Sequence, residues 1–285
     1  MTLDDISKIA VVGAGTMGQG IAQISALAGY DVVLYDLNSE VLEKASSNID
    51  SNLSKGIDRG KLTQEDKEAA LKRIVFSDEE SALVADVVIE AIVEKLDIKK
   101  SLFTRLEELN KENTILASNT SSIPITRIAT SLKHPERFVG MHFFNPAHIM
   151  KLVEVISGAA TDSAVASTIS ALAEKLGKVP VMAKDAPGFI VNRVARHFYV
   201  EGLKVLEEGV CNVEGIDRLV ESSGFRMGPF KLMDLIGVDT NYSVTESMFN
   251  AFHQDAKFRP SRIQQQKVDA GHHGRKSQKG FYNYD

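Results

Sequence analysis

The sequence has 285 residues, of which 44% are hydrophobic and 25% are charged, so disorder, collagen-like repeats and coiled coil are poor fits. This length allows one large or two moderate domains, and we expect two. The 33 basic and 38 acidic side chains give a net charge of −5, which argues against nucleic acid or an anionic membrane as the main partner.

Two absences narrow the class of protein further. No apolar run reaches the ~18 residues that a spanning helix needs, and the first residues lack a signal-peptide pattern, so we expect a cytoplasmic protein without a membrane partner. The single cysteine, Cys211, excludes an internal disulfide and a cysteine-based zinc cluster. We therefore expect no metal site.

The first half of the chain alternates between two hydrophobic periods. Short apolar runs, typical of strands buried on both faces, occur at residues 9–12, 32–35, 74–76, 87–89 and 115–117. Helical spacing falls between these runs, as at residues 96–109. Gly29 is placed to end one helix and Pro124 to begin another. This alternation predicts an α/β fold with a parallel, doubly wound sheet.

A glycine-rich loop, 13-GAGTMG-18, lies between the first predicted strand and the first helix. Such glycines allow a tight turn, close approach of the backbone to a pyrophosphate, and close packing of helix on strand. An acidic residue, Asp36, follows 18 positions after the last glycine, and this context favours a dinucleotide site over an ordinary turn. Asp36 would bind the ribose hydroxyls and repel a 2′-phosphate, which favours NAD over NADP. The expected contacts are Gly13, Gly15, Thr16, Met17, Gly18 and Asp36.

Apolar runs at residues 138–144 and 152–156 each contain one ionisable residue, His142 and Glu154. A charge in a buried run is costly unless it has a partner. An antiparallel pairing around a turn centred on His148 would place positions 142 and 154 opposite each other. The residue types alone favour a structural ion pair over a catalytic one.

After residue 164 the helical period takes over. We expect a helix over about 164–177, a last strand at 179–182, and helices over the spans 189–208, 213–223, 229–236 and 239–252. The sequence 185-DAPG-188 marks a boundary between them. We therefore expect a Rossmann-type domain over residues 1–185 and a smaller all-helical domain over 186–285.

Several long motifs carry a family resemblance that covers essentially the whole chain. They are VVGAGTMGQGIA near the start, VIEAIVE at 88–94, SNTSS at 118–122, HFFNPAHIMKLVEV at 142–155, DAPGFIVNR at 185–193, MGPFKLMDLIGVD at 227–239 and the final GRKSQKGFYNY. Together they resemble the 3-hydroxyacyl-CoA dehydrogenases, most closely the shorter bacterial 3-hydroxybutyryl-CoA dehydrogenases. The resemblance implies NAD-dependent interconversion of (S)-3-hydroxybutyryl-CoA and acetoacetyl-CoA.

The resemblance also implies roles for four residues. His142 would be the catalytic acid/base, since oxidising a hydroxyl requires proton removal from oxygen as hydride leaves carbon. Glu154 would hold its imidazole and stabilise the imidazolium. Ser121 would contact substrate and nicotinamide, although a helix cap before Pro124 is the alternative from the residues alone. Asn192, otherwise a helix-surface amide, would reach across the domain cleft to the substrate.

Further contacts follow from the same mapping. Glu94, Lys99, Asn145 and Lys276 would approach the cofactor, although without the resemblance Glu94 and Lys99 read as solvated charges. Asn52, Lys55 and Arg59 share a helix face with Asn48, where a CoA site and a merely solvated face fit equally well on charge pattern. In the family, the CoA contacts correspond to Asn52 and Arg59. A homodimer joined through the helical domain is also implied.

Two positions depart from the family pattern. Gln278 replaces the second glycine of a common G-R-K-[ST]-G-x-G-F motif, which bears on the local turn and on the reach of Lys276. Relatives usually carry a proline near His148. The alternatives are a dehydrogenase of sugar acids such as gulonate and a non-catalytic NAD-binding protein.

Overall fold

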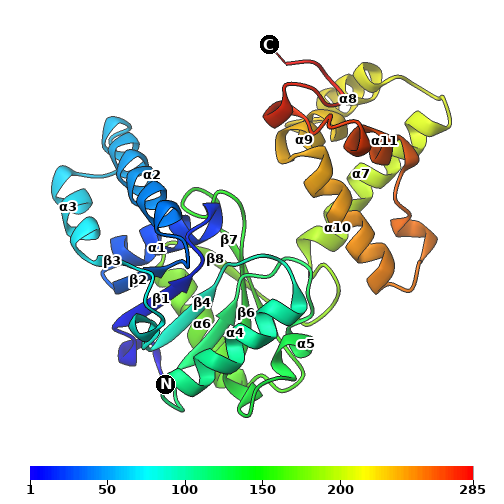
Figure 1. Cartoon of the computed structure of the whole chain (residues 1–285). Coiled ribbons are helices and arrows are strands. Elements are labelled where there is room, and N and C mark those ends of the chain that lie inside the picture. The colour runs from blue at the N-terminus through cyan, green and yellow to red at the C-terminus, as the bar shows by residue number, and fades with distance from the viewer. Residues whose placement is uncertain (285) are drawn as a thin grey trace. The chain divides into compact units, whose positions relative to one another are not determined.

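The computed structural model describes residues 1–284, and the chain divides into two compact units (Figure 1). The first unit spans residues 1–186 and the second begins at residue 187. The first is built around a sheet and the second from helices. None of the helices within residues 1–284 has the length and apolar character that crossing a bilayer requires.

The first unit contains one mixed sheet in the strand order β3-β2-β1-β4-β5-β6-β7-β8. Its strands are β1 (Lys8–Val12), β2 (Asp31–Tyr35), β3 (Ile74–Ser77), β4 (Val87–Glu90), β5 (Ile115–Ser118), β6 (Phe138–Phe143), β7 (Leu152–Ser157) and β8 (Val179–Lys184). All neighbours pair in parallel except β6 and β7. The predicted doubly wound sheet is confirmed, and the strand order reverses at β1 and β4, where such folds bind ligands.

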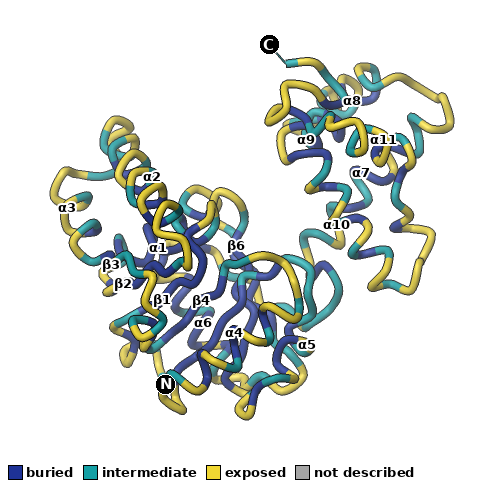
Figure 2. Tube along the Cα trace, viewed as in Figure 1, coloured by how far each residue is buried: buried dark blue, intermediate teal, exposed yellow. Residues whose placement is uncertain are grey.

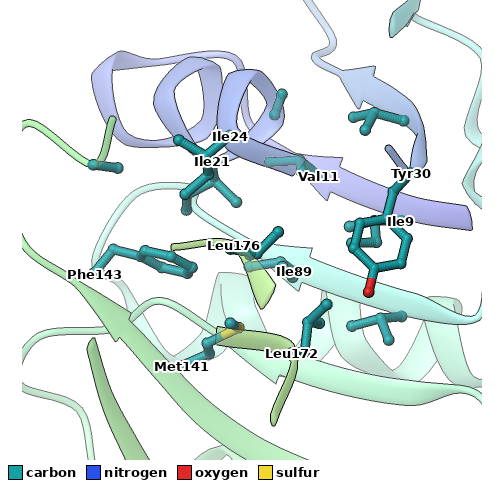
Figure 3. Packing of buried hydrophobic residues seen from close by; sticks show 14 of the residues in the cluster. Ile9, Val11, Ile21, Ile24, Tyr30, Ile89, Met141, Phe143, Leu172 and Leu176 are labelled. Carbon is teal, nitrogen blue, oxygen red and sulfur yellow. The ribbon is translucent and has the colours of Figure 1, made fainter. Parts of the chain in front are cut away.

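Helices connect the strands of this sheet. They are α1 (Thr16–Leu27), α2 (Ser39–Asp58), α3 (Gln64–Lys72), α4 (Leu96–Leu109), α5 (Ile125–Ala129) and α6 (Ser163–Lys175), with short 3₁₀ turns η1 (Leu3–Asp5), η2 (Glu80–Leu83) and η3 (Pro135–Arg137). Gly29, at φ +97°, ends α1 as predicted. Ile21 and Ile24 of α1 pack over Val11 of β1 in the core (Figure 3). Strands β1, β4 and β6 are buried, whereas α2 and α3 are exposed along much of their length (Figure 2).

Strands β6 and β7 form an antiparallel hairpin with the predicted register. His142 lies opposite Glu154, and Met141 lies opposite Val155. Because side chains alternate between the two faces of a strand, His142 and Glu154 project from the same face of the sheet. The strand register alone therefore brings the two ionisable side chains together.

The second unit packs its helices around a core of Tyr199, Leu203, Ile216, Phe230 and Met233. Its helices are α7 (Val191–Glu207), α8 (Val213–Ser222), α9 (Pro229–Ile236), α10 (Val238–Ala251) and α11 (Arg262–Asp269), with 3₁₀ turns η4 (Ala256–Phe258) and η5 (Arg275–Ser277). The first four lie within two residues of their predicted spans, whereas α11 was not singled out from the sequence.

Two buried aspartates hold the segment that follows η5. Asp217 of α8 accepts a hydrogen bond from the Tyr282 hydroxyl at 2.8 Å. Asp234 of α9 accepts from the backbone N–H groups of Phe281 and Tyr282, both at 2.9 Å, and from the Tyr284 hydroxyl at 3.0 Å. Burial and the Asp234 carboxylate raise the pKa of Tyr284 to about 12. Residues 281–284 thus complete the packing of α8 and α9.

Candidate active site

The glycine-rich loop joins β1 to α1 and presents exposed backbone at the start of that helix. Gly13 adopts φ +100° and donates its N–H to the Tyr35 carbonyl at 2.8 Å. A Cβ at Gly18 would lie 1.7 Å from the Gly13 carbonyl oxygen, so only glycine fits there. A Cβ at Gly15 would meet no atom within 4 Å, and Gly15 and Thr16 are exposed. The open amides of this helix start suit a pyrophosphate.

A cavity of about 390 Å³ opens beside this loop, at the carboxyl ends of β1, β2 and β4. It is lined by Val12, Gly13, Tyr35, Asp36, Leu37, Ile92, Asp97, Ile98, Ser101, Leu102 and Arg105. Asp36 is fixed at its rim, because its carboxylate accepts from the N–H groups of Ala14 at 2.9 Å and Asn38 at 3.1 Å. Leu37 is 85% exposed, so part of the apolar wall of this cavity faces solvent.

These features fit the adenosine half of NAD. The apolar walls suit a purine, and the Asp36 carboxylate stands where ribose hydroxyls would donate to it. Arg105 also lines the cavity, a residue that sequence reasoning missed because it lies far from the loop in the chain. Its Nε is bound to Glu80 Oε1 at 2.9 Å, so its charge is already paired. With Arg105 paired and the Asp36 carboxylate at the rim, this end of the cavity disfavours a 2′-phosphate.

The segment after β5, residues 119–122, is held by Glu94. Glu94 Oε1 accepts from Thr120 Oγ1 at 2.6 Å, from Ser121 N at 2.9 Å and from Ser122 N at 3.1 Å. Burial alone would raise the pKa of Glu94, but the Lys99 ammonium and these hydrogen bonds outweigh it and keep the pKa below its usual value. Glu94 is therefore an anion that shapes the backbone carrying Ser121.

Lys99, predicted from the family resemblance as a cofactor contact, departs from the alternative that its residue type alone suggested. The reading of Lys99 as a solvated charge is wrong, because the residue is only 1% exposed. Its Nζ lies 2.5 Å from Glu90 Oε1 and 3.2 Å from Glu94 Oε2. The position could have been read from spacing, since Lys99 continues the buried face of α4 that includes Phe103 and Leu106.

Glu90, at the end of β4, was also missed. Its carboxylate is fully buried and accepts from Lys99 Nζ, from Ile92 N at 2.8 Å and from Ser118 Oγ at 2.6 Å. Burial raises the pKa of Glu90, although Lys99 and these hydrogen bonds act in the opposite direction. The signal was a carboxylate directly after the apolar run 87–89, the same kind of signal that singled out Glu154.

The predicted His–carboxylate pair is present in the hairpin. His142 Nδ1 lies 2.7 Å from Glu154 Oε2, and the two side chains are 7% and 1% exposed. The Phe144 ring packs on the imidazole with a centroid distance of 4.6 Å. An ionised Glu154 can only accept a hydrogen bond, so Nδ1 carries the proton and Nε2 is the basic nitrogen of the neutral ring. This tautomer suits a general base.

The loop between β6 and β7 is anchored at both ends. Lys178, which is buried, donates to the carbonyls of Ala147 at 2.5 Å and Met150 at 2.9 Å. Burial lowers the pKa of Lys178. At the end of β6, Phe143 N donates to Asn119 Oδ1 at 2.8 Å, which ties the hairpin to the segment after β5. Asn145 is exposed on this loop.

The remaining candidates lie on or directly after α2 and in the second unit. Asn52 and Lys55 lie on α2, and Arg59 is the residue that caps its C-terminal end; Lys55 and Arg59 are exposed. In the second unit, Asn192 is half-buried in the first turn of α7. Lys276 Nζ donates to Asp239 Oδ2 at 2.7 Å. Gln278 takes the left-handed conformation, φ +58°, that a glycine would adopt without strain.

In comparisons with known proteins, both units match models of the same protein family. Residues 8–186 match the model for the 3-hydroxyacyl-CoA dehydrogenase NAD binding domain, and residues 188–284 match that for the 3-hydroxyacyl-CoA dehydrogenase C-terminal domain. The 3-hydroxyadipyl-CoA dehydrogenase of Escherichia coli is 48% identical over 98% of this chain, which spans only 59% of that relative.

Two further relatives match over nearly their full length. The 3-hydroxybutyryl-CoA dehydrogenase of Bradyrhizobium diazoefficiens is 43% identical over 98% of this chain and 96% of its own. The crystal structure of (S)-3-hydroxybutyryl-CoA dehydrogenase from Ralstonia eutropha superposes with a TM-score of 0.94 at 40% identity, covering 98% of this chain and 99% of that one.

Proposed function

The chain belongs to the 3-hydroxyacyl-CoA dehydrogenase family of NAD-dependent oxidoreductases, and we propose that it interconverts (S)-3-hydroxybutyryl-CoA and acetoacetyl-CoA. The observation that carries this proposal is the buried pair of His142 and Glu154 in the β6–β7 hairpin. Similar relatives that match over nearly their full length are named for this substrate.

The residues of the hairpin account for the proton in this reaction. The bound nicotinamide would accept the hydride from the hydroxyl-bearing carbon of the substrate. His142 Nε2 would take the proton of the same hydroxyl, so that a ketone forms as both leave. Glu154 holds Nδ1–H and stabilises the imidazolium that results. In the reductive direction the imidazolium returns its proton to the alkoxide oxygen.

We assign the other candidates by their surroundings. Gly13, Gly15, Thr16, Met17, Gly18 and Asp36 would bind the pyrophosphate and adenosine of NAD, with Asn145 and Lys276 as further cofactor contacts. Ser121, whose backbone is fixed by Glu94, would hydrogen-bond the reacting oxygen next to His142. Asn192 would contact the substrate. Asn52 and Lys55 on α2, with Arg59 at its C-terminal end, would bind the CoA moiety of the substrate.

The test is a steady-state assay of NADH oxidation with acetoacetyl-CoA. We expect turnover, a lower rate with NADPH, and loss of turnover in His142→Asn with NADH binding retained, as followed by NADH fluorescence. A panel that adds 3-hydroxyadipyl-CoA and gulonate reports the substrate class. Faster turnover of gulonate than of any acyl-CoA would replace the proposal by a sugar-acid dehydrogenase. Tight NADH binding without any turnover would indicate a non-catalytic NAD-binding protein.

We also propose a homodimer formed through the helical unit. Its surface carries exposed apolar side chains, among them Leu219, Phe225, Leu235 and Ile236. Exposed apolar side chains are typical of subunit interfaces when they gather on one face. Light scattering of the purified protein checks the mass, and fractionation of cells that express a tagged chain checks the proposed cytoplasmic location.

A further inference from the structure

The backbone of β6 loses its parallel neighbour just before it reaches His142. Strand β5 pairs with β6 only as far as Ser118, which lies opposite Gly140. The chain then turns away from β6 and is held by Glu94 through hydroxyl and N–H groups of residues 120–122. On this side of the sheet, the last residues of β6 therefore depend on other groups for their hydrogen bonds.

The side chain of Asn119 supplies one of these hydrogen bonds. Its Oδ1 accepts from the backbone N–H of Phe143 at 2.8 Å, in the place where a continued strand would present a carbonyl. The backbone N–H of Asn119 donates to the Glu90 carbonyl at 2.8 Å, so Asn119 is itself tied to the end of β4. Asn119 thus continues the edge of the sheet with its side chain.

The hydrogen bond from Phe143 acts on the peptide group that joins it to His142. Because a peptide group is planar, fixing its N–H also restrains the backbone of the preceding residue, His142. The Phe143 ring is a second anchor, since it is 2% exposed and lies in the core with Ile21 and Met141 (Figure 3). Glu154 holds the imidazole through Nδ1. The position of the imidazole is therefore set by its backbone as well as by its carboxylate partner.

We propose that Asn119 is a positioning residue that sets the distance between the His142 imidazole and Ser121. Asn119 lies two positions before Ser121 in the chain and is bound to the residue directly after His142, so it links the two segments. The inference rests on the proposed function, in which His142 takes the proton and Ser121 hydrogen-bonds the reacting oxygen. One substrate oxygen can meet both groups only if both lie within hydrogen-bond reach of it at once.

The leucine variant at position 119 isolates this role. Asn119→Leu keeps the approximate shape of the side chain but leaves the N–H of Phe143 without its acceptor. We expect kcat with acetoacetyl-CoA to fall about tenfold to a hundredfold, because a displacement of about 1 Å in a positioned group has effects of that size. NADH affinity, followed by fluorescence, should change less than about threefold. Unchanged kcat with at least tenfold weaker NADH binding would overturn the proposal and indicate a cofactor contact instead.

The aspartate variant tests whether the oxygen acceptor is the group that matters. Asn119→Asp keeps an oxygen in the place of Oδ1, so the N–H of Phe143 retains its partner and kcat should stay within about threefold of the wild type. A loss as large as that of Asn119→Leu would overturn the assignment. In both variants, nitrogen NMR of the His142 ring should show the proton on Nδ1, because Glu154 still holds it. A proton moved to Nε2 would show that the tautomer, and not the position, accounts for the loss.

Asn110 offers a matched control at the other end of the same strands. It is half-buried like Asn119, and its Oδ1 accepts from the backbone N–H of Ala85 at 3.0 Å, before β4 and β5 begin. Asn110→Leu should lower the melting temperature to a similar degree, yet leave kcat unchanged. A loss of kcat in both leucine variants would show that general destabilisation, and not positioning, accounts for the effect.

Hydrogen–deuterium exchange gives a readout that needs no turnover. The Phe143 amide should exchange faster in Asn119→Leu than in the wild type, Asn119→Asp or Asn110→Leu, because only the first variant removes its acceptor. Asn119→Ala also removes the acceptor and serves if Asn119→Leu does not fold. Unchanged exchange at this amide would refute the positioning role, whereas faster exchange in a protein without acyl-CoA turnover would leave it standing and refute the proposed function alone.

Discussion

Replacing Glu154 by glutamine should abolish most catalysis while preserving the fold of the hairpin. The amide has the same shape as the carboxylate, but it can donate a hydrogen bond to Nδ1 of His142. Donation to Nδ1 favours the tautomer with its proton on Nε2, and a ring in that form cannot accept the hydroxyl proton of the substrate. The variant also removes the anion that stabilises imidazolium.

The size of the effect follows from the burial of the pair. The two side chains are 7% and 1% exposed and their atoms are 2.7 Å apart, so water screens the interaction little. Removing one partner from a buried pair typically costs about 3–5 kcal/mol. The imidazolium forms only as the proton is transferred, so an interaction of this size that is made with the imidazolium lowers kcat by about 10²–10⁴-fold when it is lost, at 1.36 kcal/mol for each tenfold change. The upper end matches the loss of about 10⁴-fold when the acid of a Ser-His-Asp triad becomes an amide.

The assay compares kcat for NADH oxidation by acetoacetyl-CoA in the wild type and Glu154→Gln, with NADH binding followed by fluorescence. The chain supplies a control in His134 and Glu136, whose Nδ1–Oε1 distance is 3.2 Å and whose side chains are 47% and 54% exposed. Glu136→Gln should leave kcat unchanged, because exposed pairs contribute little. Retention of kcat within tenfold in Glu154→Gln would refute the general-base assignment.

Three further predictions concern the glycine-rich loop and the stability of the two units. Gly15→Ala should change the free energy of unfolding by less than about 1 kcal/mol but weaken NADH binding at least tenfold. Gly18→Ala should lower both stability and NADH binding, because its Cβ would overlap the Gly13 carbonyl oxygen. Calorimetry measures the stability of each variant, and NADH fluorescence measures binding. Burial alone would raise the pKa of Asp86, but hydrogen bonds from Ser7 and Lys8 outweigh it and lower the pKa. The ionised Asp86 therefore stabilises the fold above about pH 4, and this contribution is lost as the pH falls through the lowered pKa. The Tm difference between wild type and Asp86→Asn should accordingly be largest near neutral pH and shrink below about pH 4, and a constant difference would contradict the linkage. Gln278→Gly should raise the free energy of unfolding by up to about 1 kcal/mol by relieving its left-handed backbone, and a decrease in denaturant melts would show that no strain is stored there.

The sequence predicted the hairpin because its signals are local. Two apolar runs, each with one ionisable residue, and a loop of known length fix the register, and the register fixes which side chains meet. The glycine-rich loop with Asp36 was equally readable, since spacing along the chain corresponds there to distance in space.

The cluster of Glu90 and Lys99 could not be read in the same way. Its members come from a strand end and from the next helix, and their meeting depends on how α4 packs on the sheet. A charged residue on a helix is solvated far more often than buried, and this prior outweighed the apolar spacing that Lys99 shares with Phe103. Arg105 at the adenosine cavity is a contact of the same tertiary kind.

The two aspartates of the helical unit impose an order on events during synthesis. Asp217 and Asp234 leave the ribosome about fifty residues or more before Tyr282 and Tyr284, whose hydroxyls they bind. Until residues 281–284 emerge, Asp234 lacks the donors that this segment supplies, and Asp217 has only the backbone N–H groups of Phe230 and Lys231. Every strand of the sheet has been made by then. The N-terminal unit can thus fold and become protease-resistant on the ribosome before the C-terminal unit does. In nascent chains halted at residue 279, limited proteolysis should therefore cleave the C-terminal unit faster than the N-terminal unit.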